Sequence, residues 1–183
     1  MLFRKATKEE IPRIWEIILQ AKAQMKRAGS EQWQDGYPTA EIIGNDIEQG
    51  IGFVICDRKR VIAYGAVSFD SEPAYEEIAD KWQGSSYVVV HRLAVADECK
   101  HRGVAHAFFD YTEQYALQKG IGSFRVDTNF DNAYMLRLMK SCHFVYRGEV
   151  HYGIRGSRMA FERVMLNGVR REEEDSKDNA CDK

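Results

Sequence analysis

The fold is decided by two neighbouring stretches, Val88-Val89-Val90-His91-Arg92-Leu93-Ala94-Val95 and Lys100-His101-Arg102-Gly103-Val104-Ala105. The first is mostly apolar and is typical of a buried central strand. A short polar loop with a glycine follows it, and a long helical pattern comes next. A strand, a loop with free backbone N–H groups and a helix N-terminus together form a site for an anion.

Helices and strands alternate around this pair. A capping box of Thr7 and Glu10 begins the first helix, and Gly120 ends the third. The strand–helix–strand unit of residues 88–128 predicts two parallel strands with a right-handed crossover, and the remaining strand pairs predict antiparallel hairpins. The sequence predicts helices at 7–26, 39–49, 103–118 and 132–142, and strands at 2–6, 53–56, 61–69, 86–95, 124–128, 144–152 and 158–164.

Two segments fall outside this pattern. Residues 70–85 form a polar insert between two predicted strands. From Asn167 onward the chain is charged and poor in apolar residues, which favours a disordered tail. We therefore expect one domain over residues 1–166 and a tail over 167–183.

Composition narrows the class of protein. Hydrophobic residues make up 44% and charged residues 30% of 183 residues, and the net charge is −2, as in an ordinary globular protein. The chain lacks a basic excess that would favour nucleic acid, an apolar run that would span a membrane, and a signal-peptide pattern at its start. Its four cysteines are scattered without a C-x-x-C pair, which favours reduced thiols in the cytoplasm over disulfides or a metal site. We expect Cys56 and Cys142 in the core and Cys99 exposed in the loop.

The order of elements and the loop resemble the GNAT superfamily of N-acetyltransferases, whose signature is (Gln/Arg)-x-x-Gly-x-(Gly/Ala). Here Lys100 stands where Gln or Arg is usual, and Gly103 and Ala105 fit. The resemblance implies an α/β (α+β) fold with a mixed, mostly antiparallel central sheet, a splayed parallel strand pair and flanking helices. It also implies acetyl-CoA as donor, a small-molecule or peptide amine as acceptor, and a homodimer.

The same resemblance implies where acetyl-CoA binds. The backbone of Leu93, Ala94 and Val95 would bind the pantetheine arm, and the pyrophosphate would meet the amides of residues 101–105, with Gly103 allowing close approach. Asn132 would contact the coenzyme, although it also fits as a helix N-cap. The implied coenzyme-binding residues are Leu93, Ala94, Val95, Lys100, His101, Arg102, Gly103, Val104, Ala105 and Asn132.

A base must remove a proton from the acceptor amine, which is mostly protonated near pH 7. His91 is one candidate, because its usual pKa of about 6.5 suits the task and some members of the superfamily carry a histidine at the similar place. The alternative is a histidine packed in the sheet. Glu76 and Glu77 in the insert are the other candidates, and a surface carboxylate pair is the alternative for them.

The chain departs from the family's pattern at the general acid. A tyrosine is usual five residues before the closing phenylalanine, Phe144, but Met139 stands there and has no proton to donate. The usual Gly-Phe ending is His143-Phe144. Tyr134 and Tyr146 are near in sequence without an assigned role, and solvent could protonate a thiolate whose pKa is about 8.5.

Aromatic residues in loops are candidates for the acceptor site. Trp33 and Tyr37 lie between the first two helices, and Tyr75 lies in the insert. Such side chains line pockets or cover the core, and the sequence leaves both open. No metal ligand set is expected.

Two functions remain. The first is an N-acetyltransferase that moves the acetyl group directly to a primary amine without a covalent enzyme intermediate. The alternative is a non-catalytic acyl-CoA-binding or sensor domain, suggested by Met139 at the usual tyrosine position.

Overall fold

A computed structural model describes residues 1–165 and has a seven-stranded sheet in the order β1-β2-β3-β4-β5-β7-β6. Only β4 and β5 pair in parallel, and the other neighbours are antiparallel. The predicted mixed sheet with one parallel pair is therefore confirmed. The strands are β1 (Leu2–Lys5), β2 (Gly52–Asp57), β3 (Arg60–Ser68), β4 (Tyr87–Val95), β5 (Ser123–Thr128), β6 (Val145–His151) and β7 (Ser157–Val164).

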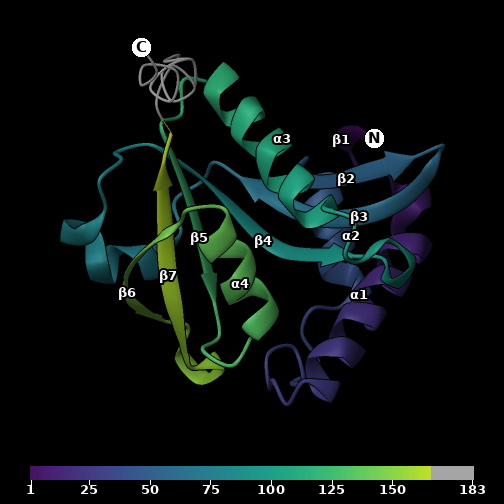
Figure 1. The fold of residues 1–183 in the computed structure, drawn as a ribbon, viewed down its shortest axis with the longest axis horizontal. Helices are drawn as coiled ribbons and strands as arrows, with labels where there is room; N and C mark the ends of the chain where they lie inside the picture. Colours follow the sequence, from purple (N-terminus) through teal and green to yellow (C-terminus); the bar gives the residue numbers. More distant parts are fainter. Residues whose placement is uncertain (166–183) are drawn as a thin grey trace, which may run out of the picture.

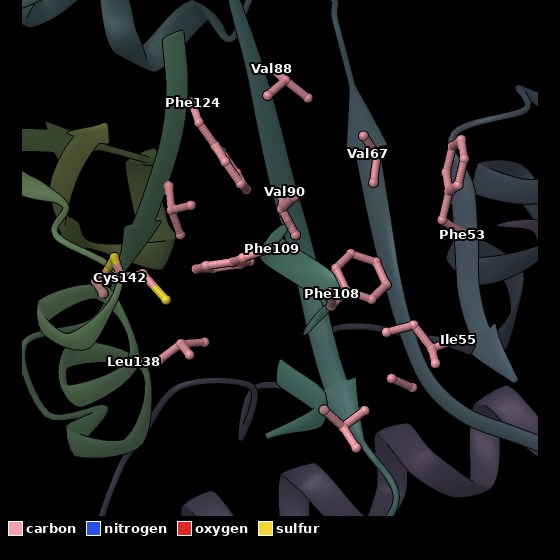
Figure 2. Packing of buried hydrophobic residues seen from close by; sticks show 14 of the residues in the cluster. Phe53, Ile55, Val67, Val88, Val90, Phe108, Phe109, Phe124, Leu138 and Cys142 are labelled. Carbon is pink, nitrogen blue, oxygen red and sulfur yellow. The ribbon is translucent and has the colours of Figure 1, made fainter. Parts of the chain in front are cut away.

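Helices cover both faces of the sheet (Figure 1). Strand alternation divides the side chains: Phe53 and Ile55 of β2 pack with α3 and α4, whereas Val54 and Cys56 pack with α1 and α2. The first cluster is the larger and centres on Phe108 and Phe109 (Figure 2). The α-helices are α1 (Ile11–Arg27), α2 (Ala40–Glu48), α3 (Val104–Gln118) and α4 (Ala133–Ser141), and the short 3-10 helices are η1 (Lys8–Glu10), η2 (Pro73–Lys81), η3 (Asp97–Cys99) and η4 (Gly153–Arg155).

A bulge in β4 changes which way its side chains point. Val88 and Val90 face the α3 side, and after the bulge Leu93 and Val95 face it. The register with β3 shifts at this point, and Arg92 has a φ of +58°. One extra residue in a strand exchanges the faces of all residues after it.

The parallel pair separates after a short contact. β5 pairs with β4 only from Tyr87 to Val89, so the edge of β4 from Val90 to Val95 has no partner in β5. Figure 1 shows the two strands diverging. The bulge and the divergence together leave backbone groups of β4 available to a ligand.

The insert at 70–85 is an ordered cover rather than an open polar loop. Within it, η2 buries Tyr75 and Ile78 against β6 and β7. Glu162 of β7, with no exposed surface, holds the end of the insert by accepting hydrogen bonds from the backbone N–H groups of Gln83 (2.9 Å) and Gly84 (3.1 Å). The insert is thereby fixed to the sheet.

The prediction that Cys99 is exposed is wrong. The turn of η3 directs its side chain into the cluster under α3, where Cys99 is 5% exposed. Cys56 and Cys142 are buried, as predicted. The tail predicted at 167–183 lies outside the described residues. In residues 1–165, no helix is long and apolar enough to cross a membrane.

Candidate active site

A first cavity of about 510 Å³ lies between β4, α3 and α4. Leu93, Ala94 and Val95 form its β4 wall, and the loop before α3 closes one end. Five of the six predicted residues from 100 to 105 line it: Lys100, His101, Gly103, Val104 and Ala105.

The loop before α3 has two residues in the left-handed conformation. His101 and Gly103 both have positive φ values, +58° and +73°, and Gly103 directly precedes the first turn of α3. A Cβ added at Gly103 would meet no atom within 4 Å, so the space beside its backbone is open to a ligand. The free N–H groups of α3 and their dipole favour a negative group there.

Asn132 caps α4 from the wall of the same cavity. Its Oδ1 accepts from Met135 N (3.1 Å), and its Nδ2 donates to Gln32 Oε1 (2.8 Å). Gln32 Oε1 also accepts from the Thr128 hydroxyl (3.0 Å). The N-cap interpretation is therefore confirmed, and these bonds fix the loop after α1 to the end of β5.

A second cavity, also of about 510 Å³, is lined by β4, the end of β5, the loop between α1 and α2, and η4. The loop between α1 and α2 contributes Trp33 and Tyr37, as predicted, and β4 contributes His91 and Arg92. This cavity is more polar than the first. Its titratable side chains include Glu31, Asp35, Glu72, His91, Arg92, Asp127, Arg155 and Arg158.

His91 lies beside a carboxylate that the sequence analysis did not single out. Its Nε2 is 3.5 Å from Glu72 Oε2, just before η2. Burial lowers the pKa of His91, and Arg92 adds to this effect, while Asp127 and Asp46 oppose it. Burial likewise raises the pKa of Glu72, with a contribution from Asp127. The lowered pKa keeps His91 neutral near pH 7, as a base requires.

Arg92 is largely buried and pairs with Asp46 of α2. Its Nε and Nη2 donate to the two carboxylate oxygens at 2.9 and 2.7 Å, and its Nη1 donates to the Tyr37 hydroxyl at 2.7 Å. Tyr64, fully buried, donates to the same Asp46 at 2.6 Å. These bonds fix the bulge and position Tyr37.

Asp127, at the end of β5, accepts hydrogen bonds from two tyrosines. The hydroxyl of Tyr75 lies 2.8 Å and that of Tyr152 3.0 Å from Asp127 Oδ2. Burial raises the pKa of each phenol, and the neighbouring Asp127 adds to this effect. Both tyrosines therefore remain protonated donors and hold the carboxylate at the cavity wall.

The two cavities meet. Four residues line both of them: Met25, Leu93, Asn132 and Met135. Leu93 follows the bulge in β4 directly, so the backbone that has no partner in β5 passes through the junction. Two ligands, one in each cavity, would meet at this place.

Comparison with known proteins identifies the family. The model of the family described as acetyltransferase (GNAT) family matches residues 12–144. The chain belongs to the GNAT family of acetyltransferases. No curated protein matches its sequence significantly.

Solved structures of GNAT proteins have the same fold. A GNAT-family acetyltransferase from Streptococcus agalactiae is 28% identical, with a TM-score of 0.78 over 90% of this chain and 95% of that one. One from Listeria monocytogenes is 15% identical (TM-score 0.70; 90% and 94% covered). A ribosomal-protein-alanine N-acetyltransferase from Brucella melitensis is 14% identical (0.63; 90% and 100%). The last two similarities show the fold alone.

Several predicted residues lie away from the cavities of this GNAT protein. Glu77 is exposed and pairs with His151 Nδ1 at 2.7 Å, and Glu76 is exposed beside it, because η2 turns both outward. Neither lines the second cavity, so the structure does not support them as bases. Tyr75 is buried and reaches the cavity only through Asp127. Arg102 lies beside Cys99 rather than on the cavity wall.

Met139 and the two tyrosines near it in sequence lie in different parts of the structure. Met139 is fully buried and lines neither cavity. Tyr134 is 44% exposed and lines the first cavity beside Lys100 and His101, at the end closed by the loop. Tyr146 is exposed on β6 and packs on Phe161. Among residues 1–165, no group of three or more His, Cys, Asp and Glu residues could hold a metal ion.

Proposed function

We propose that this GNAT protein is an N-acetyltransferase that uses acetyl-CoA to acetylate a primary amine. One observation carries the proposal: a cavity at the N-terminus of α3 and a polar cavity lined by His91 meet at the free backbone of β4. The first cavity fits a coenzyme that carries a pyrophosphate, and the second cavity fits an amine. The junction is where the acetyl group would pass from one to the other.

The residues of the first cavity suit each part of acetyl-CoA, which supplies an acetyl thioester when bound. The N–H groups at the start of α3 and the open space at Gly103 would hold the pyrophosphate. The free edge of β4 from Leu93 to Val95 would bind the pantetheine arm as a strand. Its backbone N–H groups would also polarise the thioester carbonyl.

In the second cavity, His91 would remove a proton from the acceptor ammonium. Glu72 Oε2, 3.5 Å away, would stabilise the imidazolium that results. Asp127 would hold the ammonium before it is deprotonated, since its carboxylate is fixed by Tyr75 and Tyr152. General-base assistance of this kind contributes about 10²–10⁴-fold to a rate.

We propose direct transfer, without an acetylated enzyme. Cys56, Cys99 and Cys142 are buried, and none of them lines the second cavity. The leaving thiolate would take its proton from solvent, because Met139 is buried and Tyr134 lies near the loop rather than at the junction. A thiol with a pKa of about 8.5 is a tolerable leaving group.

Calorimetry with acetyl-CoA, followed by thiol release with a mixed panel of primary amines and short peptides, tests this function. Binding with a dissociation constant in the micromolar range and amine-dependent thiol release is the expected result. Binding without thiol release across the panel would instead support the non-catalytic acyl-CoA-binding function. An absence of binding would overturn both.

A further inference from the structure

Charges in the second cavity are separated into two groups. Glu72 and Asp127 lie with His91 where β4 and β5 diverge. Arg155 and Arg158 come from η4 and the start of β7. The cavity therefore has carboxylates beside His91 and two arginines on η4 and β7.

Neither arginine is neutralised by the protein. Among residues 1–165, no carboxylate oxygen lies within 4 Å of the guanidinium nitrogens of Arg155 or Arg158. Arg92, the third arginine of the cavity, differs because it pairs with Asp46. Arg155 is exposed and Arg158 is partly buried, and both line the cavity, where a cationic group attracts an anionic ligand group.

The conformations of both arginines leave donors free. The guanidinium of Arg155 stacks on the ring of Tyr37, 4.3 Å from its centroid, and stacking leaves the N–H groups in the guanidinium plane available. Arg158 Nη1 donates to the carbonyl oxygens of Arg155 (2.7 Å) and Ser157 (3.0 Å), which fixes the side chain without neutralising it.

One tyrosine separates each arginine from the catalytic side of the cavity. Arg155 stacks on Tyr37, whose hydroxyl accepts from Arg92, the neighbour of His91. Arg158 lies 6.0 Å from the ring of Tyr152, whose hydroxyl donates to Asp127. Each arginine is thus separated by a single tyrosine from a residue beside the proposed base or ammonium site.

Two further carboxylates line the cavity from the loop between α1 and α2. Asp35 Oδ1 accepts from the backbone N–H of Tyr37, and Glu31 is exposed beside it. Within residues 1–165, neither carboxylate forms an ion pair with Arg155 or Arg158. They add to the attraction for an ammonium and leave the two arginines without a partner.

We propose, on the basis of the function proposed above, that the acceptor is a small primary amine that also carries a carboxylate. Its ammonium would bind at Asp127 and Glu72, and its carboxylate would bind at Arg155 and Arg158. An Arg–carboxylate pair of this kind is bidentate and selective. Free amino acids have this chemistry, whereas simple amines and amino-acid amides lack the carboxylate.

Matched acceptors test the proposal in the full-length protein. Thiol release is measured with each of a set of amino acids, its amide and the amine that lacks the carboxylate, for example phenylalanine, phenylalaninamide and phenethylamine. We expect kcat/KM for the best amino acid to exceed that for its amide and its amine at least about tenfold, as for a hydrogen bond to a charged group. Phosphoethanolamine is included to detect a phosphate in place of the carboxylate.

Variants connect the preference to the arginines. In Arg155→Gln and Arg158→Gln, KM for the amino acid should rise about 10- to 100-fold, while KM for its amide stays unchanged. Arg155→Lys should keep part of the preference for the amino acid over its amide, because lysine retains the positive charge but lacks the bidentate guanidinium geometry. Arg60→Gln, on the surface of β3 outside both cavities, is the control.

The outcomes separate the two proposals. Equal or faster turnover of amides or simple amines overturns the carboxylate proposal and leaves the acetyltransferase intact. Preferred turnover of phosphoethanolamine also overturns it. Acetyl-CoA binding without thiol release from these acceptors and from the wider panel of amines and short peptides overturns both.

Discussion

Arg92 of β4 and Asp46 of α2 form a buried bidentate pair, with both guanidinium-to-carboxylate distances below 3.0 Å. The pair fixes the residue at the bulge, where φ is +58°. A non-glycine residue in this conformation costs about 1–3 kcal/mol and persists only where its surroundings hold it. Asp46 of α2, on the face of the sheet that α1 and α2 cover, therefore stabilises the bulge at the junction of the two cavities.

Asp46→Asn should destabilise the protein. It leaves the guanidinium of Arg92 buried beside a neutral amide, and breaking a buried pair in this way costs about 3–5 kcal/mol. For a chain of this size we expect Tm to fall by about 6–20 °C in a thermal melt. Glu41→Gln, on an exposed position of the same helix, should leave Tm within about 2 °C of the parent protein, and an equal fall in both variants would contradict the role of the pair.

His91→Ala should change the pH dependence of catalysis. The parent kcat/KM should fall in acid with a midpoint below about 6.5, because burial lowers the pKa of His91. Glu72 faces the imidazole, and Asp127, Asp46 and Arg92 are the other charges near it.

In the variant we expect the acid limb to disappear and the rate above it to drop about 10²–10⁴-fold. His151→Ala, which removes an exposed histidine outside both cavities, should retain the parent profile. A retained acid limb in the His91 variant would exclude His91 as the base.

Gly103→Val should weaken acetyl-CoA binding. The substitution strains a residue at φ +73° and fills the open space beside its backbone. We expect KM for acetyl-CoA to rise at least about tenfold, equivalent to about 1.4 kcal/mol.

Gly120→Val is a matched control, because Gly120 follows the other end of α3 with φ +74° and equally open space. The Gly120→Val variant should lose about as much stability as the Gly103→Val variant, about 1–2 kcal/mol, and its KM for acetyl-CoA should be unchanged. Equal KM values for the two variants would show that the loop does not hold the phosphates.

Asp127→Asn should raise KM for the amine about tenfold or more and leave KM for acetyl-CoA unchanged. The variant removes the charge that would hold the ammonium but keeps the size of the side chain. Tyr152→Phe, which removes one of the two donors to Asp127, should have a smaller effect in the same direction. Tyr146→Phe, exposed on β6, is the control, and a matching change in KM there would contradict this assignment.

Stability in acid should depend on Glu162. Burial alone would raise its pKa, but hydrogen bonds from Gln83 N–H, Ser123 Oγ and Gly84 N–H and the charge of Arg125 outweigh burial and hold the pKa below its usual value. The folded state therefore releases this proton more readily than the unfolded chain. Its contribution is complete above the unfolded pKa of about 4.5 and is lost as the pH falls through the folded pKa.

Urea unfolding between pH 3 and 7 measures this contribution. Glu162→Gln should be about 3–5 kcal/mol less stable at pH 7 and lose less stability in acid than the parent protein. Glu149→Gln, exposed on β6, should behave as the parent does. A variant as stable as the parent at pH 7 would show that Glu162 does not anchor the insert.

Local signals predicted the fold of this chain. Strand and helix periodicity, the Thr7–Glu10 box and the glycine before α3 act over a few residues, and the structure places each as expected. Thr7 N, for example, donates to Glu10 Oε2 at 2.9 Å.

The polar site could be predicted only in part, because its contacts join distant residues. Glu72 of the insert lies beside His91 of β4, and Asp127 accepts a hydrogen bond from Tyr75, 52 positions away in the sequence. No sequence signal marks a bulge at an arginine. Glu76 and Glu77 have the charge expected of a base, but both lie within η2 and point outward. Glu72, the residue just before η2, lines the second cavity instead.

The shared wall of the two cavities has a kinetic consequence. Within residues 1–165, Met25, Leu93, Asn132 and Met135 line both cavities and each cavity also has lining residues of its own, so we expect two ligands to be bound at once. Initial-rate plots should then intersect rather than run parallel. Any ordering of these four side chains by one ligand changes the affinity for the other, and thermodynamic linkage requires that the two affinities change by the same factor.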